Sequence, residues 1–64
     1  MYPNLRAEMA RKSVTSNDIA TALGVRPATI SWKLNGKSDF SLAEAKKIKE
    51  RLGVEMTLDE LFEE

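Results

Sequence analysis

The most informative segment of this chain reads Ser16-Asn-Asp-Ile-Ala-Thr-Ala-Leu-Gly-Val-Arg-Pro-Ala-Thr-Ile-Ser-Trp-Lys-Leu-Asn-Gly-Lys37. Ile19 and Leu23 are spaced one helical turn apart, and Gly24 is suited to end that helix in a left-handed conformation. Pro27 suits the first position of a second helix, because its missing N–H would have no partner there. The segment therefore predicts two short helices joined by a tight turn, over about 16–36.

Residues 27–35 of the second helix separate into two faces when they are projected at about 100° per residue from Ile30. Leu34 and Pro27 fall within about 60° of Ile30, on the side that faces the core. The residues on the outer side or on its flanks are Ala28, Thr29, Ser31, Trp32 and Asn35. Ala20 is small where the two helices approach, so they can cross steeply at close range. The outer face is then free to enter the major groove of DNA.

Capping patterns predict three further helices. The first is expected to begin at Pro3-Asn4 with Asn4 as its N-cap residue, and the fourth to bury Leu42, Ile48 and Leu52 along one face. Three capping boxes are expected, each a hydroxyl residue followed three positions later by an acidic one: Thr15 with Asp18, Ser41 with Glu44, and Thr57 with Glu60. No segment alternates with period two, so strands are not expected. The predicted fold is an all-α, compact five-helix bundle forming a single domain over 1–64.

The composition argues against several classes of function. The chain has 64 residues, no cysteine and no histidine, so neither a disulfide nor a structural zinc site is expected. Nucleophiles and general bases are limited to carboxylates, lysines and hydroxyls, which here occupy capping or surface positions. No apolar run approaches the roughly 20 residues that span a bilayer. We therefore expect a cytoplasmic protein without enzymatic activity, metal, cofactor or membrane contact.

The formal net charge is zero, but the charges are unevenly distributed along the chain. All ten Lys and Arg residues lie at or before Arg51, together with five of the ten acidic residues, so 1–51 carries +5. The tail after Leu52 holds the other five acidic residues and carries −5. Because phosphate groups respond to the local field, the basic part of the chain is compatible with DNA binding.

The skeleton Ile19-Ala20, Gly24-Val25 and Ile30 is followed by Asn35-Gly36-Lys37 and by the closing segments Leu52-Gly53-Val54 and Leu58-Asp59-Glu60-Leu61-Phe62. In this order and spacing, these residues resemble the phage-repressor and Cro helix-turn-helix family, also called XRE-type. The resemblance extends from Leu5 to Phe62. It implies a lambda-repressor-like DNA-binding domain in a bacterial or phage transcriptional regulator. We expect a repressor that binds a double-stranded DNA operator as a homodimer.

The resemblance also implies roles for individual residues. Base contacts are expected from Ala28, Thr29, Ser31 and Trp32 of a recognition helix over 27–35. Phosphate contacts are expected from Ser16, Asn17, Arg26, Asn35, Lys37 and Ser38. Ser16 stands where many members have Gln, and Arg26 where a small hydroxyl residue is usual. The base-reading face lacks most of the side chains that read bases in a bidentate manner, so phosphate contacts and DNA shape are expected to supply much of the discrimination.

Two questions stay open at the level of sequence. A helical protein-interaction module that pairs with another regulator would also explain the zero net charge and an exposed Trp32. The last short helix, about 58–62, carries Leu58, Leu61 and Phe62, which can complete the core or form a two-fold dimer contact. The two roles can coexist, because a short helix has two apolar edges. The resemblance favours the dimer contact.

Overall fold

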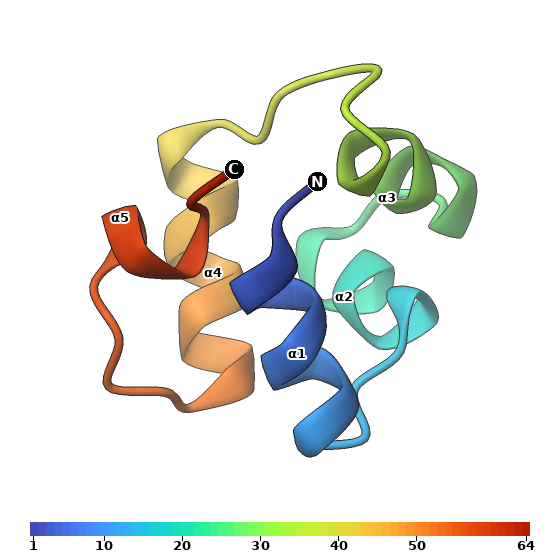
Figure 1. The fold of residues 1–64 in the computed structure, drawn as a ribbon. Coiled ribbons are helices and arrows are strands. Elements are labelled where there is room, and N and C mark those ends of the chain that lie inside the picture. Colours follow the sequence, from blue (N-terminus) through green and yellow to red (C-terminus); the bar gives the residue numbers. More distant parts are fainter.

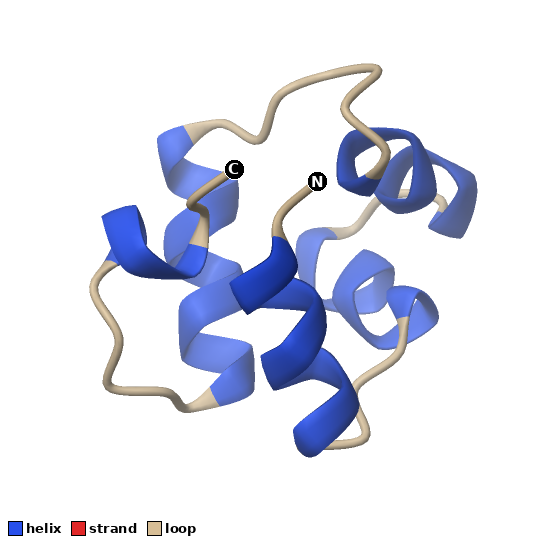
Figure 2. Cartoon of the chain, in the orientation of Figure 1, coloured by secondary structure: helices blue, strands red, loops and turns tan.

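Five helices joined by short loops make up the computed structural model, which describes residues 1–64 and contains no β-strand (Figures 1 and 2). The helices are α1 (Pro3–Arg11), α2 (Ser16–Leu23), α3 (Pro27–Leu34), α4 (Leu42–Leu52) and α5 (Leu58–Leu61). The molecule measures 26 × 20 × 20 Å, and α3 and α5 lie at opposite sides of it (Figure 1). The predicted all-α class and the five helices are confirmed. None of the helices is both long and apolar enough to reach across a lipid bilayer.

Every helix contributes one completely buried aliphatic residue to a single core. These residues are Leu5, Ile19, Ile30, Ile48 and Leu61. Burying an aliphatic side chain of this size stabilises the fold by about 1.5–3 kcal/mol relative to leaving it exposed. The spacing argument predicted the burial of Ile19, Ile30 and Ile48, because one apolar face per helix has to meet the others in a chain this short.

The three predicted capping boxes are confirmed in full. At the start of α2, the Asp18 N–H donates to Thr15 Oγ1 at 3.2 Å and the Thr15 N–H donates to Asp18 Oδ2 at 2.9 Å. The same two reciprocal hydrogen bonds join Ser41 and Glu44 at the start of α4, and Thr57 and Glu60 at the start of α5. These bonds satisfy N–H groups that have no partner within the helix, and each cap contributes about 1 kcal/mol.

The prediction that Asn4 is the N-cap residue of α1 is wrong. Tyr2 occupies the N-cap position in a left-handed conformation, with φ 56° and ψ 57°, and Pro3 is the first helical residue. Pro3 takes this position because its fixed φ suits the helix and its missing N–H costs no hydrogen bond there. Asn4 lies inside the first turn, and its side-chain amide donates to the carbonyl of Glu60 at 2.8 Å. This residue therefore joins α1 to α5 instead of capping a helix.

Two apolar residues predicted to face the core are exposed. Leu42 is 64% exposed, and Pro27 is also exposed, although both lie on the side of their helix that the core residues share. Each is the first residue of its helix. Side chains on a helix lean toward its N-terminus, so a residue in this position projects beyond the packed part of the helix and into solvent.

Candidate nucleic-acid interface

The turn between α2 and α3 brings the two helices together at Ala20, which is 1% exposed. Gly24 ends α2 with a φ of 71°, a conformation that glycine adopts without steric cost. The Val25 N–H then donates to the Ala20 carbonyl at 3.0 Å, which closes the turn. Because Ala20 carries only a methyl group, α3 can approach α2 closely while Ile30 enters the core below it. The outer face of α3 is left uncovered.

Three of the four residues predicted to contact bases lie exposed on the outer face of α3. They are Ala28, Ser31 and Trp32, and the fourth, Thr29, is half-buried. Ala28 and Trp32 are four residues apart and Ala28 and Ser31 three, so they are neighbours on the helix surface. Trp32 is 61% exposed, which is unusual for a tryptophan in a chain with so small a core. The face therefore presents one large aromatic ring among small side chains.

Basic residues stand at both ends of α3. Arg26 is the N-cap residue, with φ −77° and ψ 147°, and its side chain makes no capping hydrogen bond and is exposed. Lys37 and Ser38 follow the helix in an exposed loop, where the Lys37 N–H donates to the Trp32 carbonyl at 3.0 Å. Neither Arg26 nor Lys37 forms an ion pair within the chain. Both charges are therefore available to an anion near α3.

Arg6 reaches the carboxyl end of α3 from α1, and this contact was not predicted from the sequence. Its Nη2 donates to the carbonyl of Leu34 at 2.9 Å and to Oδ1 of Asn35 at 3.0 Å, while Nε donates to the carbonyl of Met1 at 2.9 Å. The guanidinium group places a positive charge where the helix dipole is negative. Its Nη1 group makes no hydrogen bond within the chain, so it can donate to a phosphate beside Asn35.

The other predicted phosphate contacts, Ser16 and Asn17, lie in the first turn of α2. The Asp18 carboxylate shares this turn, and the hydrogen bond from the Thr15 N–H is the main cause that lowers its pKa, so it is ionised at neutral pH. An ionised carboxylate in this turn would repel a phosphate group. Arg51, at the end of α4, lies close enough to lower the pKa of Asp18 further and so offsets part of that negative charge. The first turn of α2 is therefore a weaker anion site than the two ends of α3.

Lys33 turns away from the outer face and fixes the loop between α3 and α4. Its Nζ donates to Oε1 of Glu44 at 3.0 Å and to the carbonyl of Asp39 at 2.9 Å, and it lies 5.7 Å from the ring centroid of Phe40. The pKa of Glu44 is lowered mainly by the Ser41 N–H, with Lys33 adding to the effect. Lys33 is thus already neutralised, while Leu34 takes its predicted place in the core.

The predicted dimer residues are divided between core and surface. Leu61 is 0% exposed and lies in the core, so its side chain has no area to offer a second subunit. Its predicted role in a dimer contact is therefore corrected. Leu58 and Phe62 are half-buried and line a surface cleft. Leu61 therefore completes the core, while the dimer contact of Leu58 and Phe62 stays a prediction.

No protein-family model matches the chain, and no curated protein and no solved structure is significantly similar to it. No group of three or more His, Cys, Asp or Glu side chains is arranged to hold a metal ion. Function has therefore to be inferred from the residues of the chain itself.

Proposed function

We propose that this protein is a sequence-specific transcriptional regulator that binds double-stranded DNA through α3, and that it acts as a repressor of the phage-repressor and Cro type. In this proposal α2, the turn and α3 form a helix-turn-helix, with α3 in the major groove. Ala28, Thr29, Ser31 and Trp32 meet base edges. The resemblance implies a homodimer acting in the cytoplasm, without enzymatic activity or a cofactor.

The single observation that carries the proposal is the exposed face of α3 with an unpaired cation at each end. Trp32 lies in the middle of this face, Arg26 precedes it, and Lys37 and Arg6 lie at its far end. A rigid helix with this distribution matches the usual division of labour, in which charges at the ends hold the phosphates and side chains in the middle touch bases. Exposure of the apolar Trp32 ring to water is unfavourable, and packing of the ring on sugars or on a thymine methyl group in the complex would remove it from water.

The modest hydrogen-bonding capacity of the face limits how sequence is read. Ala28 can contact a thymine methyl group, and Ser31 can make single hydrogen bonds. The side-chain amide nitrogen of Asn35 makes no hydrogen bond within the chain, while its oxygen accepts from Arg6. We infer that phosphate contacts and DNA deformability contribute a large part of the specificity.

The sole tryptophan provides a direct test, because Trp32 lies in the proposed interface. Titration with mixed genomic fragments should change its emission. About four neutralised phosphates per subunit, or about eight per homodimer, should make log affinity fall against log salt with a slope of about −7. Sequencing the fragments that remain bound at higher salt would then define the operator. A flat salt response would rule out docking of α3 in the groove.

A protein-interaction module is the second candidate, and the exposed Trp32 favours it, because exposed tryptophans are common at the centre of protein interfaces. In that case Trp32 emission would not respond to DNA at any salt concentration but would respond to another regulator. The same titration thus separates the two functions.

A further inference from the structure

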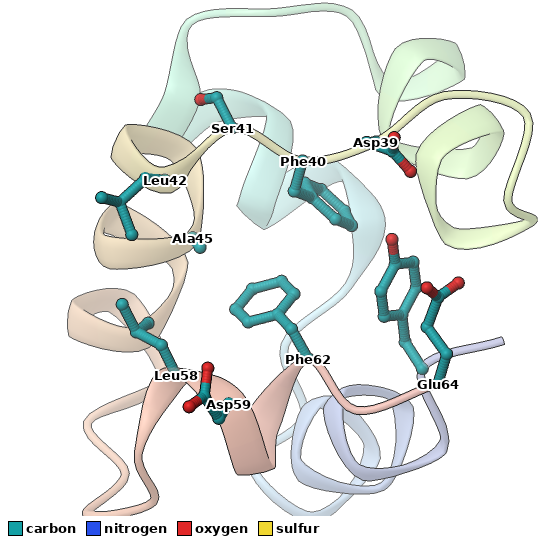
Figure 3. Close-up of a pocket in the computed structure, with 10 residues that line it drawn as sticks. Asp39, Phe40, Ser41, Leu42, Ala45, Leu58, Asp59, Phe62 and Glu64 are labelled. Atoms are coloured by element: carbon teal, nitrogen blue, oxygen red, sulfur yellow. The ribbon is translucent and has the colours of Figure 1, made fainter.

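A surface cleft of about 510 Å³ is formed by α4, α5, the N-terminal residues and the loop that joins α3 to α4 (Figure 3). Its lining residues are Tyr2, Asp39, Phe40, Ser41, Leu42, Ala45, Leu58, Asp59, Phe62 and Glu64. In Figure 3, Leu42 and Leu58 lie toward one side of the cleft, and Asp39 and Glu64 toward the other. None of these residues belongs to the proposed DNA interface.

The cleft has a firm aromatic floor. Tyr2, Phe40 and Phe62 pack edge to face in a closed triad, with ring centroids 5.4 to 6.0 Å apart. This geometry is favourable for aromatic pairs, and each ring comes from a different part of the chain. The floor is therefore preformed, which is typical of sites that bind a partner without first rearranging.

One wall of the cleft is apolar and uncovered. Leu42 is 64% exposed, and Leu58 one helix away is half-buried. Leu42 is among the three most exposed large apolar residues of the chain, with Trp32 and Met1. A leucine that faces water beside aromatic rings offers contact area to an apolar side chain from outside.

Every charged residue that lines the cleft is acidic. Asp39, Asp59 and Glu64 make no side-chain hydrogen bond and no ion pair within the chain. In contrast, the carboxylates that begin α2, α4 and α5 are all engaged in capping boxes. The carboxylates of the cleft are thus free to meet cations, whereas those of the caps already hold N–H groups.

The negative charge converges on the aromatic floor. The pKa of Tyr2 is raised, first by burial of the phenol and then by the charges of Glu64 and Asp39. Two carboxylates, Asp39 from the loop before α4 and Glu64 from beyond α5, therefore act on the same hydroxyl group. An occupant that brings a positive charge to this place would relieve the repulsion between them.

We propose that this cleft docks a short segment of a partner protein that carries an apolar anchor beside Lys or Arg residues. The anchor contacts Leu42, Leu58 and the aromatic floor, and the cations meet the unpaired carboxylates. Such a division, with an apolar centre and a charged rim, is general among protein interfaces. The proposal does not depend on DNA binding by α3, because the two surfaces have no residue in common.

Charge also excludes the two other obvious occupants. A second copy of the chain placed symmetrically over the cleft would present the same lining, which has three carboxylates and no cation, so these charges would stay without a partner. In this proposal the homodimer contact therefore lies elsewhere than at Leu58 and Phe62. A nucleic acid would meet the same carboxylates with its phosphates. A basic segment of another protein is the occupant that satisfies both the apolar wall and the acidic residues.

The test selects short random peptides displayed on phage against the intact chain, and maps the selected peptides on the protein by NMR chemical-shift changes. The expected result is enrichment of peptides that combine Leu or an aromatic residue with Lys or Arg, with shifts confined to the cleft. The pair Asp59→Asn and Glu64→Gln should weaken binding by about tenfold. The control pair Glu50→Gln and Glu55→Gln makes the same change in net charge outside the cleft and should leave binding unchanged.

Leu42→Ala supplies a second variant that keeps the fold intact, because Leu42 is outside the core. It should weaken peptide binding while the unfolding transition stays where it is. Enrichment of peptides without basic residues would overturn the proposal, as would chemical shifts outside the cleft or equal losses in the control pair. Self-association that Leu42→Ala abolishes, measured by sedimentation, would also overturn it, because a second copy would then be the occupant.

Discussion

The outer face of α3 and the cleft between α4 and α5 are both exposed and aromatic, but they carry opposite charge. Arg26, Lys37 and Arg6 flank Trp32 on α3, whereas Asp39, Asp59 and Glu64 line the cleft. In neither group does a side chain form an ion pair within the chain. A zero net charge is therefore compatible with two surfaces of opposite local charge, and we propose a different kind of partner for each.

This division explains how a neutral chain can be proposed to bind DNA. Exposed charges act over roughly a Debye length, about 8 Å at physiological ionic strength, whereas the molecule is 26 Å long. A phosphate near Arg26, at the opposite end of α3 from the loop that carries Asp39, is thus largely screened from the carboxylates of the cleft. The electrostatic field close to each surface, and not the net charge of the chain, therefore governs which charged partner is attracted there.

The largest expected effect is on stability, and it compares Leu61 in the core with Leu58 at the cleft. Leu61→Ala should lower the free energy of unfolding by about 2–5 kcal/mol, because its side chain is fully buried and a cavity would remain. Leu58→Ala should cost roughly half as much, because Leu58 is half-buried at the cleft. Urea denaturation followed by circular dichroism measures both. Equal costs would mean that the two leucines do not lie on different sides of α5.

The next effect tests the charges of the α3 face. Arg26→Ala should weaken binding to every DNA sequence by about three- to tenfold and reduce the salt slope by about two, because one phosphate contact is lost from each subunit of the homodimer. The matched control is Lys46→Ala, which also removes one positive charge. Lys46 lies on α4, one turn after Leu42 and outside the proposed DNA interface, so its loss should leave affinity unchanged. Equal losses in both variants would mean that net charge, and not the α3 face, controls binding.

A smaller and more selective effect is expected for the base-reading residues. Ser31→Ala should change the preferred base at one position of the operator by up to about tenfold, with little loss of affinity for unrelated DNA. Selection of bound fragments with the unmodified protein and with Ser31→Ala measures the base preference. Arg26→Ala serves as the comparison, because it should lower affinity without changing the base preference. A uniform loss for Ser31→Ala would place Ser31 among the phosphate contacts.

The smallest effect concerns acid stability. Because the folded state lowers the pKa of Glu44 below its ordinary 4.5, the ionised carboxylate stabilises the fold at neutral pH. This contribution is lost as pH falls below about 4.5, since the unfolded state then binds more protons. Glu44→Gln should be slightly less stable at neutral pH and should lose less stability on acidification. Glu50→Gln, on an exposed residue of the same helix, should follow the unmodified protein in a pH series of urea titrations.

The sequence predicted what depends on neighbouring residues. The capping boxes join residues three positions apart, and the buried faces of α2 and α3 repeat with the helical period. Gly24 takes the left-handed conformation expected of it. Each of these features is determined within one or two turns of helix, so no knowledge of the tertiary structure was needed.

The features that the sequence missed join distant residues. Arg6 binds Leu34 across 28 positions, and Asn4 binds Glu60 across 56. No periodic pattern marks such pairs, because any exposed polar residue of α1 has the same local signature. The same reason explains why the sequence left the burial of Leu61 open, since it depends on how α5 meets the other helices. It also explains why the cleft was missed, because its walls come from separate parts of the chain.

The contact of Tyr2 with Phe62 has a consequence for how the chain acquires its structure. The two rings, 6.0 Å apart, close a loop that includes almost every residue described. Such a closure forms late, because its entropic cost rises with the length of chain that it spans. We therefore expect a fragment that ends before α5 to remain largely unfolded. During synthesis, the domain should fold cooperatively only after nearly all of it has left the ribosome. Joining the two ends and opening the loop before α4 would give a circular permutant that folds faster.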